Sequence, residues 1–147
     1  MPDQNLIDGL IATYRELNMR VRQLPEDKLQ QRTAESASVR EIVLRLRDDE
    51  LRFSQALKER ITGVPMPDIF GEDMPVLGTE NPDDTTANMI AQFGTAREST
   101  LAMLQSVGDE EWDAAPDGAK SIRTRIQELV ANDRRQLERI DGLIKAA

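Results

Sequence analysis

Apolar residues recur at the period of an α-helix through most of the chain, and this pattern restricts the fold more than any other feature. In the first stretch the apolar stripe, at about 100° of rotation per residue, consists of Leu6, Ile7, Leu10, Tyr14, Leu17, Val21 and Leu24. Similar stripes follow, and no segment alternates with period two long enough to form a β-strand. The pattern predicts an all-α chain with helices near residues 4–22, 38–62, 85–107 and 121–145.

Helix-start and helix-stop signals separate these four segments. Ser38 and Glu41 have the spacing of a capping box, in which each side chain accepts a hydrogen bond from a free N–H of the first turn. Shorter turns are expected near residues 26–29 and 109–112, the second of which places Trp112 against the helices. We therefore expect one four-helix domain over residues 1–147.

The segment 63–84 is expected to be a long loop between the second and third helices. It holds four prolines, three glycines and six acidic residues, and it contains neither Lys nor Arg. A loop of this length is unusual in a compact domain. A long connection at this point fits a bundle with a crossover better than a simple up-down-up-down order. We expect an ordered crossover that packs through its own apolar residues, and the alternative is a lid over a ligand.

The chain has no cysteine and no histidine. Disulfides, thiolate nucleophiles and Cys-based zinc sites are thereby excluded, and so is the commonest acid–base group at neutral pH. We therefore expect no cofactor.

The net charge of -8 argues against nucleic acid and anionic membrane as partners. No apolar run approaches the roughly 20 residues that cross a bilayer, so a cytoplasmic location is expected.

Three charged residues interrupt the apolar stripes at mid-length of three different helices. On a helical wheel Glu50, Arg97 and Asp133 lie close to the centre of the second, third and fourth stripes. Burying one such charge alone costs several kcal/mol, so we expect the three side chains to be buried and to pair with one another. The alternative interpretation is a polar pocket that binds an anion, a carboxylate or a metal ion.

Three stretches of the sequence resemble the motifs of the DinB/YfiT-like four-helix proteins. They lie at residues 38–50 (SVREIVLRLRDDE), 93–112 and 121–140. Their order and spacing extend the resemblance over nearly the whole chain. It implies a four-helix bundle with a long loop between the second and third helices. It also implies a divalent metal held by three histidines, one from the second helix and an i, i+4 pair from the fourth.

The positions of those three histidines are occupied here by Arg45, Asn132 and Gln136. A guanidinium offers no lone pair, and amide oxygens are weak ligands for transition metals. The metal-dependent thiol transfer and hydrolase-type activities known or proposed for the family are therefore not expected. We expect the three residues to converge as a metal-free polar cluster, in which Arg45 replaces the metal cation beside Asp49.

The sequence thus leaves three functions open and does not identify a ligand, a substrate or a catalytic residue. The first is a non-catalytic, metal-free bundle that binds a small ligand or a protein partner. The second is a metal-dependent transferase or hydrolase with a relocated carboxylate site, and the third is a structural or assembly protein that acts as a homodimer. The candidate residues of a buried polar cluster or pocket are Arg45, Asp49, Glu50, Arg97, Asn132, Asp133 and Gln136.

Overall fold

A computed structural model describes residues 3–32, 37–63, 84–115 and 118–146 of the chain. The helices in these residues are α1 (Gln4–Arg20), α2 (Glu26–Leu29), α3 (Val39–Ile61), α4 (Thr86–Gln105), α5 (Asp109–Asp113) and α6 (Ile122–Ala146). The described residues include no β-strand. The all-α prediction is confirmed, and the two expected turns are the short helices α2 and α5.

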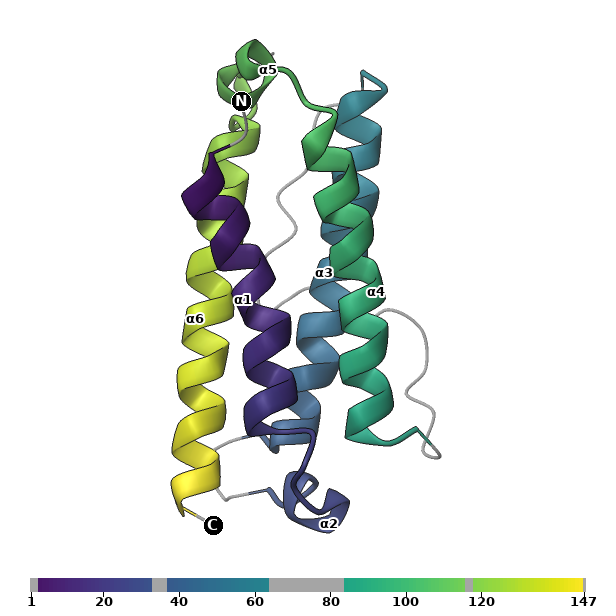
Figure 1. The fold of residues 1–147 in the computed structure, drawn as a ribbon, viewed down its shortest axis with the longest axis vertical. Coiled ribbons are helices and arrows are strands. Elements are labelled where there is room, and N and C mark those ends of the chain that lie inside the picture. Colours follow the sequence, from purple (N-terminus) through teal and green to yellow (C-terminus); the bar gives the residue numbers. More distant parts are fainter. Residues whose placement is uncertain (1–2, 33–36, 64–83, 116–117, 147) are drawn as a thin grey trace.

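The four long helices α1, α3, α4 and α6 lie side by side, and the short helices α2 and α5 lie at opposite ends of the molecule (Figure 1). Helices α3 and α4 run in the same direction, while α1 and α6 run in the opposite one (Figure 1). The chain must therefore cross the length of the molecule between α3 and α4, as the sequence indicated. The connection itself, residues 64–83, lies outside the described residues.

Each long helix packs against two of the other three. Helix α1 contacts α4 and α6, and α3 also contacts α4 and α6. The four helices thus form a ring in the order α1, α6, α3, α4. In this ring α3 has one flank toward α4 and another toward α6, whereas α6 has one flank toward α1 and another toward α3.

Polar side chains cap the N-termini of the long helices. Asp3 caps α1, and Ser38 and Glu41 form the predicted capping box at the start of α3. Thr85 caps α4, where its side chain accepts a hydrogen bond from the backbone N–H of Asn88. These caps satisfy backbone N–H groups that have no partner within the helix.

The short helix α2 holds the N-terminus of α4 in place. The Glu26 carboxylate accepts hydrogen bonds from the backbone N (3.0 Å) and the hydroxyl (2.9 Å) of Thr86, and from Arg40 Nη1 (2.8 Å). Burial raises the pKa of Glu26, but the hydrogen bonds from Gln30, Thr86 and Arg40 outweigh burial and keep this pKa below its usual value. The carboxylate also lies at the positive end of the α4 dipole, where a negative charge is stabilising.

The buried apolar residues form two separate clusters, one toward each end of the ring. In each long helix the members of the two clusters are separated by buried polar positions, among them Thr13 in α1, Glu50 in α3, Arg97 in α4 and Asp133 in α6. A polar layer therefore divides the core at mid-length. Ile61, the last residue of α3, is 41% exposed.

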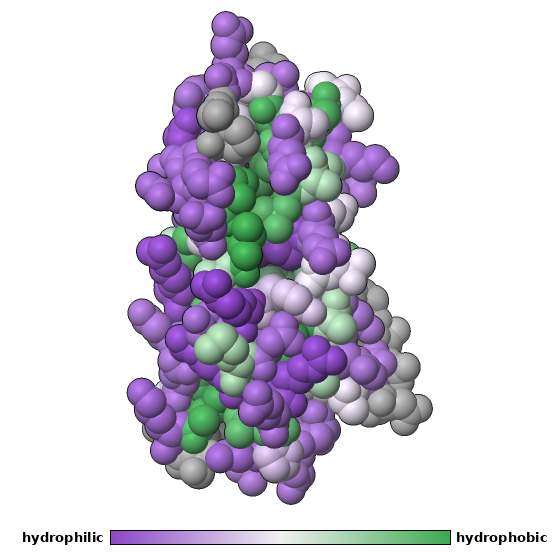
Figure 2. All heavy atoms as spheres, viewed as in Figure 1, coloured by the Kyte–Doolittle hydropathy of each residue, from purple (hydrophilic) through white to green (hydrophobic). Residues whose placement is uncertain are grey.

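The surface is mostly polar on the face drawn in Figure 2, where hydrophobic residues gather between the upper halves of α1 and α4 and in a smaller group near the lower end. Within the described residues, no helix is both long and apolar enough to cross a membrane.

Candidate functional site

Arg97 is the centre of the polar layer and is only 2% exposed. Its Nη2 lies 2.8 Å from Glu50 Oε1, and its Nη1 lies 3.0 Å from Asp133 Oδ2. Nη1 also donates to the carbonyl oxygen of Leu10 (2.8 Å), and the guanidinium lies over the Phe93 ring at 4.8 Å from its centroid. The prediction that Glu50, Arg97 and Asp133 are buried and paired is confirmed.

Thr13 completes this layer, and the sequence analysis did not identify it. Its hydroxyl donates to Asp133 Oδ2 at 2.6 Å. Through Thr13 and the Leu10 carbonyl, helix α1 joins α3, α4 and α6 in one hydrogen-bonded network. The signal was present in the sequence, because Thr13 interrupts the apolar stripe between Leu10 and Leu17 just as the three charged residues interrupt theirs.

The electrostatics of the layer suit a structural role. Burial raises the pKa of Asp133, against the opposing effects of Arg97 and Thr13. Burial lowers the pKa of Arg97, but the carboxylates of Glu50 and Asp133 outweigh burial and raise it, so Arg97 keeps its charge. The charged side chains of the layer are at most 2% exposed. The layer can fix the register of the helices, but it presents no reactive group to solvent.

A second charged cluster lies along one side of α3. The Asp49 carboxylate has Arg45 Nε at 3.2 Å from its Oδ1 and Arg52 Nη1 at 3.6 Å from the same oxygen. Burial raises the pKa of Asp49 to about 6, and the neighbouring charges of Asp48 and Glu50 add to this effect, while Arg45 and Arg52 oppose it. The sequence singled out Arg45 and Asp49 but not Arg52.

Asn132 and Gln136 make their hydrogen bonds along α6. Asn132 Oδ1 accepts from Gln136 Nε2 (3.3 Å) and from Arg135 Nη2 (3.4 Å). Gln136 Oε1 in turn accepts from Arg139 Nη1 (2.9 Å). The hydrogen bond between Asn132 and Gln136, like the ion pair between Arg45 and Asp49, connects two residues of one helix. The expected convergence of Arg45 with the two amides stays a prediction.

Ion pairs and hydrogen bonds between neighbouring helices identify the flank on which each cluster lies. On α3, Arg47 Nη1 donates to Gln92 of α4 (2.7 Å), and Arg52 lies about 140° around the axis from Arg47. On α6, Asp141 pairs with Arg20 of α1 (2.5 Å). Asn132 lies about 180° from Asp141.

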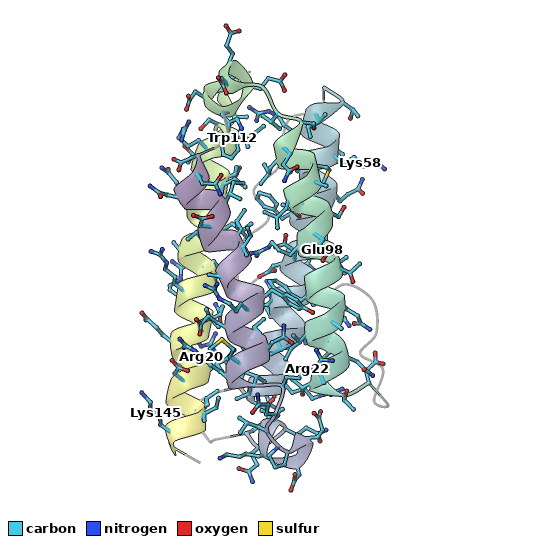
Figure 3. The ribbon with its side chains drawn as sticks, in the orientation of Figure 1. Arg20, Arg22, Lys58, Glu98, Trp112 and Lys145 are labelled. Atoms are coloured by element: carbon cyan, nitrogen blue, oxygen red, sulfur yellow. The ribbon has the colours of Figure 1, made fainter. Side chains whose placement is uncertain are left out.

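Arg52 and Asn132 are therefore on the flanks that face away from α4 and α1. Asn132 is thus on the side of α6 toward α3, whereas Arg52 lies about 200° around the axis from the core-facing Glu50 and is on the outer side of α3. Arg97 also places the two helices in register, because it contacts both Glu50 and Asp133, which are close neighbours of Arg52 and Asn132 in sequence. Figure 3 shows the level of this contact, since the labelled Glu98 directly follows Arg97 at mid-length of α4.

The residues at the three histidine positions do not fit a transition metal. A guanidinium and two amides stand there, and Asp49, the carboxylate paired with Arg45, lies between two arginine side chains. In the part of the chain that the structure describes, no group of three or more Asp, Glu, His or Cys side chains has an arrangement that holds a metal ion.

Comparisons with known proteins found no relative. No protein-family model matches the chain, and no curated protein and no solved structure shows significant similarity to it. The resemblance to the DinB/YfiT-like proteins thus depends on the three sequence motifs, and it stays a prediction.

Proposed function

We propose that this chain is a metal-free, non-catalytic protein of the DinB/YfiT-like four-helix type, and that it binds a small polar ligand between α3 and α6. The observation that carries the proposal is the charge at the position of the family's metal site. There the cation is Arg45, paired with Asp49 at 3.2 Å. A fixed guanidinium supplies the positive charge that a metal would bring, but it cannot act as a Lewis acid.

The arrangement of the helices supports the family type. Helices α3 and α4 run parallel and need a long crossover between them (Figure 1), which is the position of the long loop that the resemblance implies. Buried hydrogen-bond donors on Arg52 and Asn132, which have no partner among the described residues, support a binding role.

A metal-free enzyme is the second candidate, and one observation favours it. The pKa of Asp49, raised to about 6 by burial, lies close to the range in which a carboxylate acts as a general base near neutral pH. On this alternative, a bound ligand would be converted by the wild-type protein and left intact by the Asp49→Asn variant.

Metal analysis tests the proposal directly. The protein, purified without added metal ions, should contain no stoichiometric transition metal by inductively coupled plasma mass spectrometry. The triple variant Arg45→His, Asn132→His, Gln136→His should acquire about one equivalent of zinc or nickel, whereas the matched single variant Arg45→His should not. One equivalent of metal in the wild-type protein would overturn the metal-free proposal, and a triple variant without metal affinity would overturn the family assignment.

A further inference from the structure

We infer that Glu26 is a latch that holds the short helix α2 over one end of the helix ring, and that neutralising its charge releases α2 while the ring stays folded. This latch is a conformational device of the fold, and it does not depend on the proposed binding role.

Helix α2 has a small area of attachment to the rest of the molecule. It lies at the lower end of the long helices (Figure 1) and spans only Glu26–Leu29. Its buried side chain is Leu29, which is 2% exposed and belongs to the apolar cluster at that end. A helix of four residues is not stable by itself in water, so α2 depends on its contacts with the ring.

The Glu26 carboxylate joins α2 to two of the long helices. Its Oε1 accepts from Arg40 Nη1 in the first turn of α3 (2.8 Å) and from the Thr86 hydroxyl at the start of α4 (2.9 Å). Its Oε2 accepts from the backbone N–H of Thr86 (3.0 Å). Among the described residues, every hydrogen bond from α2 to another helix ends on this carboxylate.

The strength of the latch depends on the charge of Glu26. Hydrogen bonds to an ionised acceptor are about twice as strong as neutral ones. Burial raises the pKa of Glu26, but the hydrogen bonds from Gln30, Thr86 and Arg40 outweigh burial and lower it. A carboxylate with a lowered folded-state pKa stabilises the fold above its ordinary pKa, and this effect is lost as the pH falls through the lowered value. Acid should therefore open the latch.

The charged groups around Glu26 are few. Helix α3 places the Arg40 guanidinium against it, which stays charged at all pH values of interest. The first turn of α4 has no charged residue, and Asp84 lies just before that helix. On α2 the other charged residues are Asp27 and Lys28. Asp27 and Asp84 are thus the carboxylates whose titration must be separated from that of Glu26.

The ring has other supports, so it should keep its shape when α2 is released. Arg97 connects the four long helices at mid-length, through Glu50, Asp133 and the Leu10 carbonyl. The second apolar cluster fills the opposite end of the ring. Release of α2 would withdraw Leu29 and expose part of the cluster that Leu29 completes.

Amide hydrogen exchange, followed by NMR at pH 7, tests the latch residue by residue. In Glu26→Gln the amides of Leu29 and Thr86 should exchange about 10-fold faster than in wild type, because a charged hydrogen-bond acceptor becomes neutral. The amides of Phe53 and Arg97, at mid-length of the ring, should keep their wild-type rates. Unchanged exchange at Leu29 and Thr86 would overturn the inference. An equal increase at all four amides, or a variant that does not fold, would overturn it as well, because either result means global loss of stability.

Matched variants separate Glu26 from its neighbours. Asp27→Asn and Asp84→Asn remove the adjacent carboxylates and should leave exchange at Leu29 unchanged, whereas an effect equal to that of Glu26→Gln would contradict the latch. Thr86→Val removes one donor to Glu26. It should speed exchange at Leu29 in the wild type and have a smaller effect in the Glu26→Gln background. Equal effects in the two backgrounds would also contradict the latch.

A pH titration of the wild type tests the role of charge. The Thr86 amide signal should shift as the pH falls, with a midpoint below the usual glutamate pKa of about 4.3. The methyl signals of Leu29 should shift with the same midpoint, because α2 leaves its site when Glu26 is protonated. Neither transition should occur in Glu26→Gln. A midpoint at or above the usual value, or the same transition in Glu26→Gln, would overturn the inference.

Discussion

The substitution Arg97→Met tests whether the polar layer holds the four helices together. Methionine keeps much of the length and volume of arginine but removes the cation that contacts Glu50 at 2.8 Å and Asp133 at 3.0 Å, and the donor to the Leu10 carbonyl at 2.8 Å. Removing one partner of a buried ion pair costs about 3–5 kcal/mol. Domains of this size have unfolding free energies of about 5–15 kcal/mol, so the variant should lose a large part of its stability.

The pH dependence of this loss distinguishes charge from packing. Without the guanidinium, the pKa of Asp133, already raised by burial, rises further. A carboxyl group whose folded-state pKa is raised contributes stability that is present at low pH and is lost as the pH rises through that pKa. The deficit of Arg97→Met should therefore be largest near pH 7.5 and should shrink toward pH 4.

Urea unfolding measures these quantities through circular dichroism at 222 nm and through the fluorescence of Trp112, the only tryptophan, which is fully buried. The control Arg134→Met changes an exposed residue of α6 and should stay within about 0.5 kcal/mol of the wild type. A loss below about 1 kcal/mol for Arg97→Met, or a deficit that does not change with pH, would refute the reasoning.

The triple variant Glu50→Gln, Arg97→Met, Asp133→Asn keeps the test informative if the single variant does not fold. It removes both carboxylate charges together with the cation, so no buried charge is left without a partner. It should be more stable than Arg97→Met at pH 7.5, and its stability relative to the wild type should depend less on pH. A triple variant that is as unstable as the single one would show that packing, and not charge, explains the loss.

Two further predictions concern other positions of the long helices. Asp49→Asn should raise the unfolding free energy at pH 8 by about 1–2 kcal/mol, a value discounted for contact with solvent. The reason is that Asp49, with its pKa of about 6, is ionised at pH 8, and this ionisation lowers the stability of the folded state. The gain in unfolding free energy over wild type should vanish as the pH falls below about 4, because Asp49 is then neutral in both the folded and unfolded states. A gain that does not change with pH would contradict this reasoning. Gly94→Ala should destabilise the protein by about 1–3 kcal/mol, because the added Cβ would lie 2.4 Å from Tyr14 Cε1. The same change in a Tyr14→Ala background should instead stabilise the protein by up to about 1 kcal/mol. Thermal unfolding of the wild type, the two single variants and the double variant measures both effects.

The polar layer could be predicted from sequence because each of its charges interrupts an apolar stripe. A charge on the stripe must be buried if the helix forms, and opposite charges at mid-length of three helices have an obvious way to pair. The same reasoning predicted the capping box of Ser38 and Glu41, since a cap depends on residues close in sequence. These features needed no knowledge of how the helices are placed in space.

The roles of Arg52 and Glu26 could not be predicted in this way. Arg52 lies beside the stripe of α3 and not on it, and a helical wheel treats such a position as part of the solvated face. Its burial depends on how α3 sits in the fold. Glu26 binds Thr86, sixty residues away, so its capping role depends on which end of the molecule each helix reaches.

The two charged clusters separate the stability of the fold from the proposed binding role. The layer around Arg97 joins all four long helices through hydrogen bonds. The cluster of Arg45, Asp49 and Arg52 is different, because its ion pairs join residues of α3 alone. Substitutions at Arg45, Asn132 and Gln136 should then leave the arrangement of the helices intact, since that arrangement depends on the layer around Arg97. On the proposed family assignment, this separation would allow the chain to lose the three histidines and keep its fold.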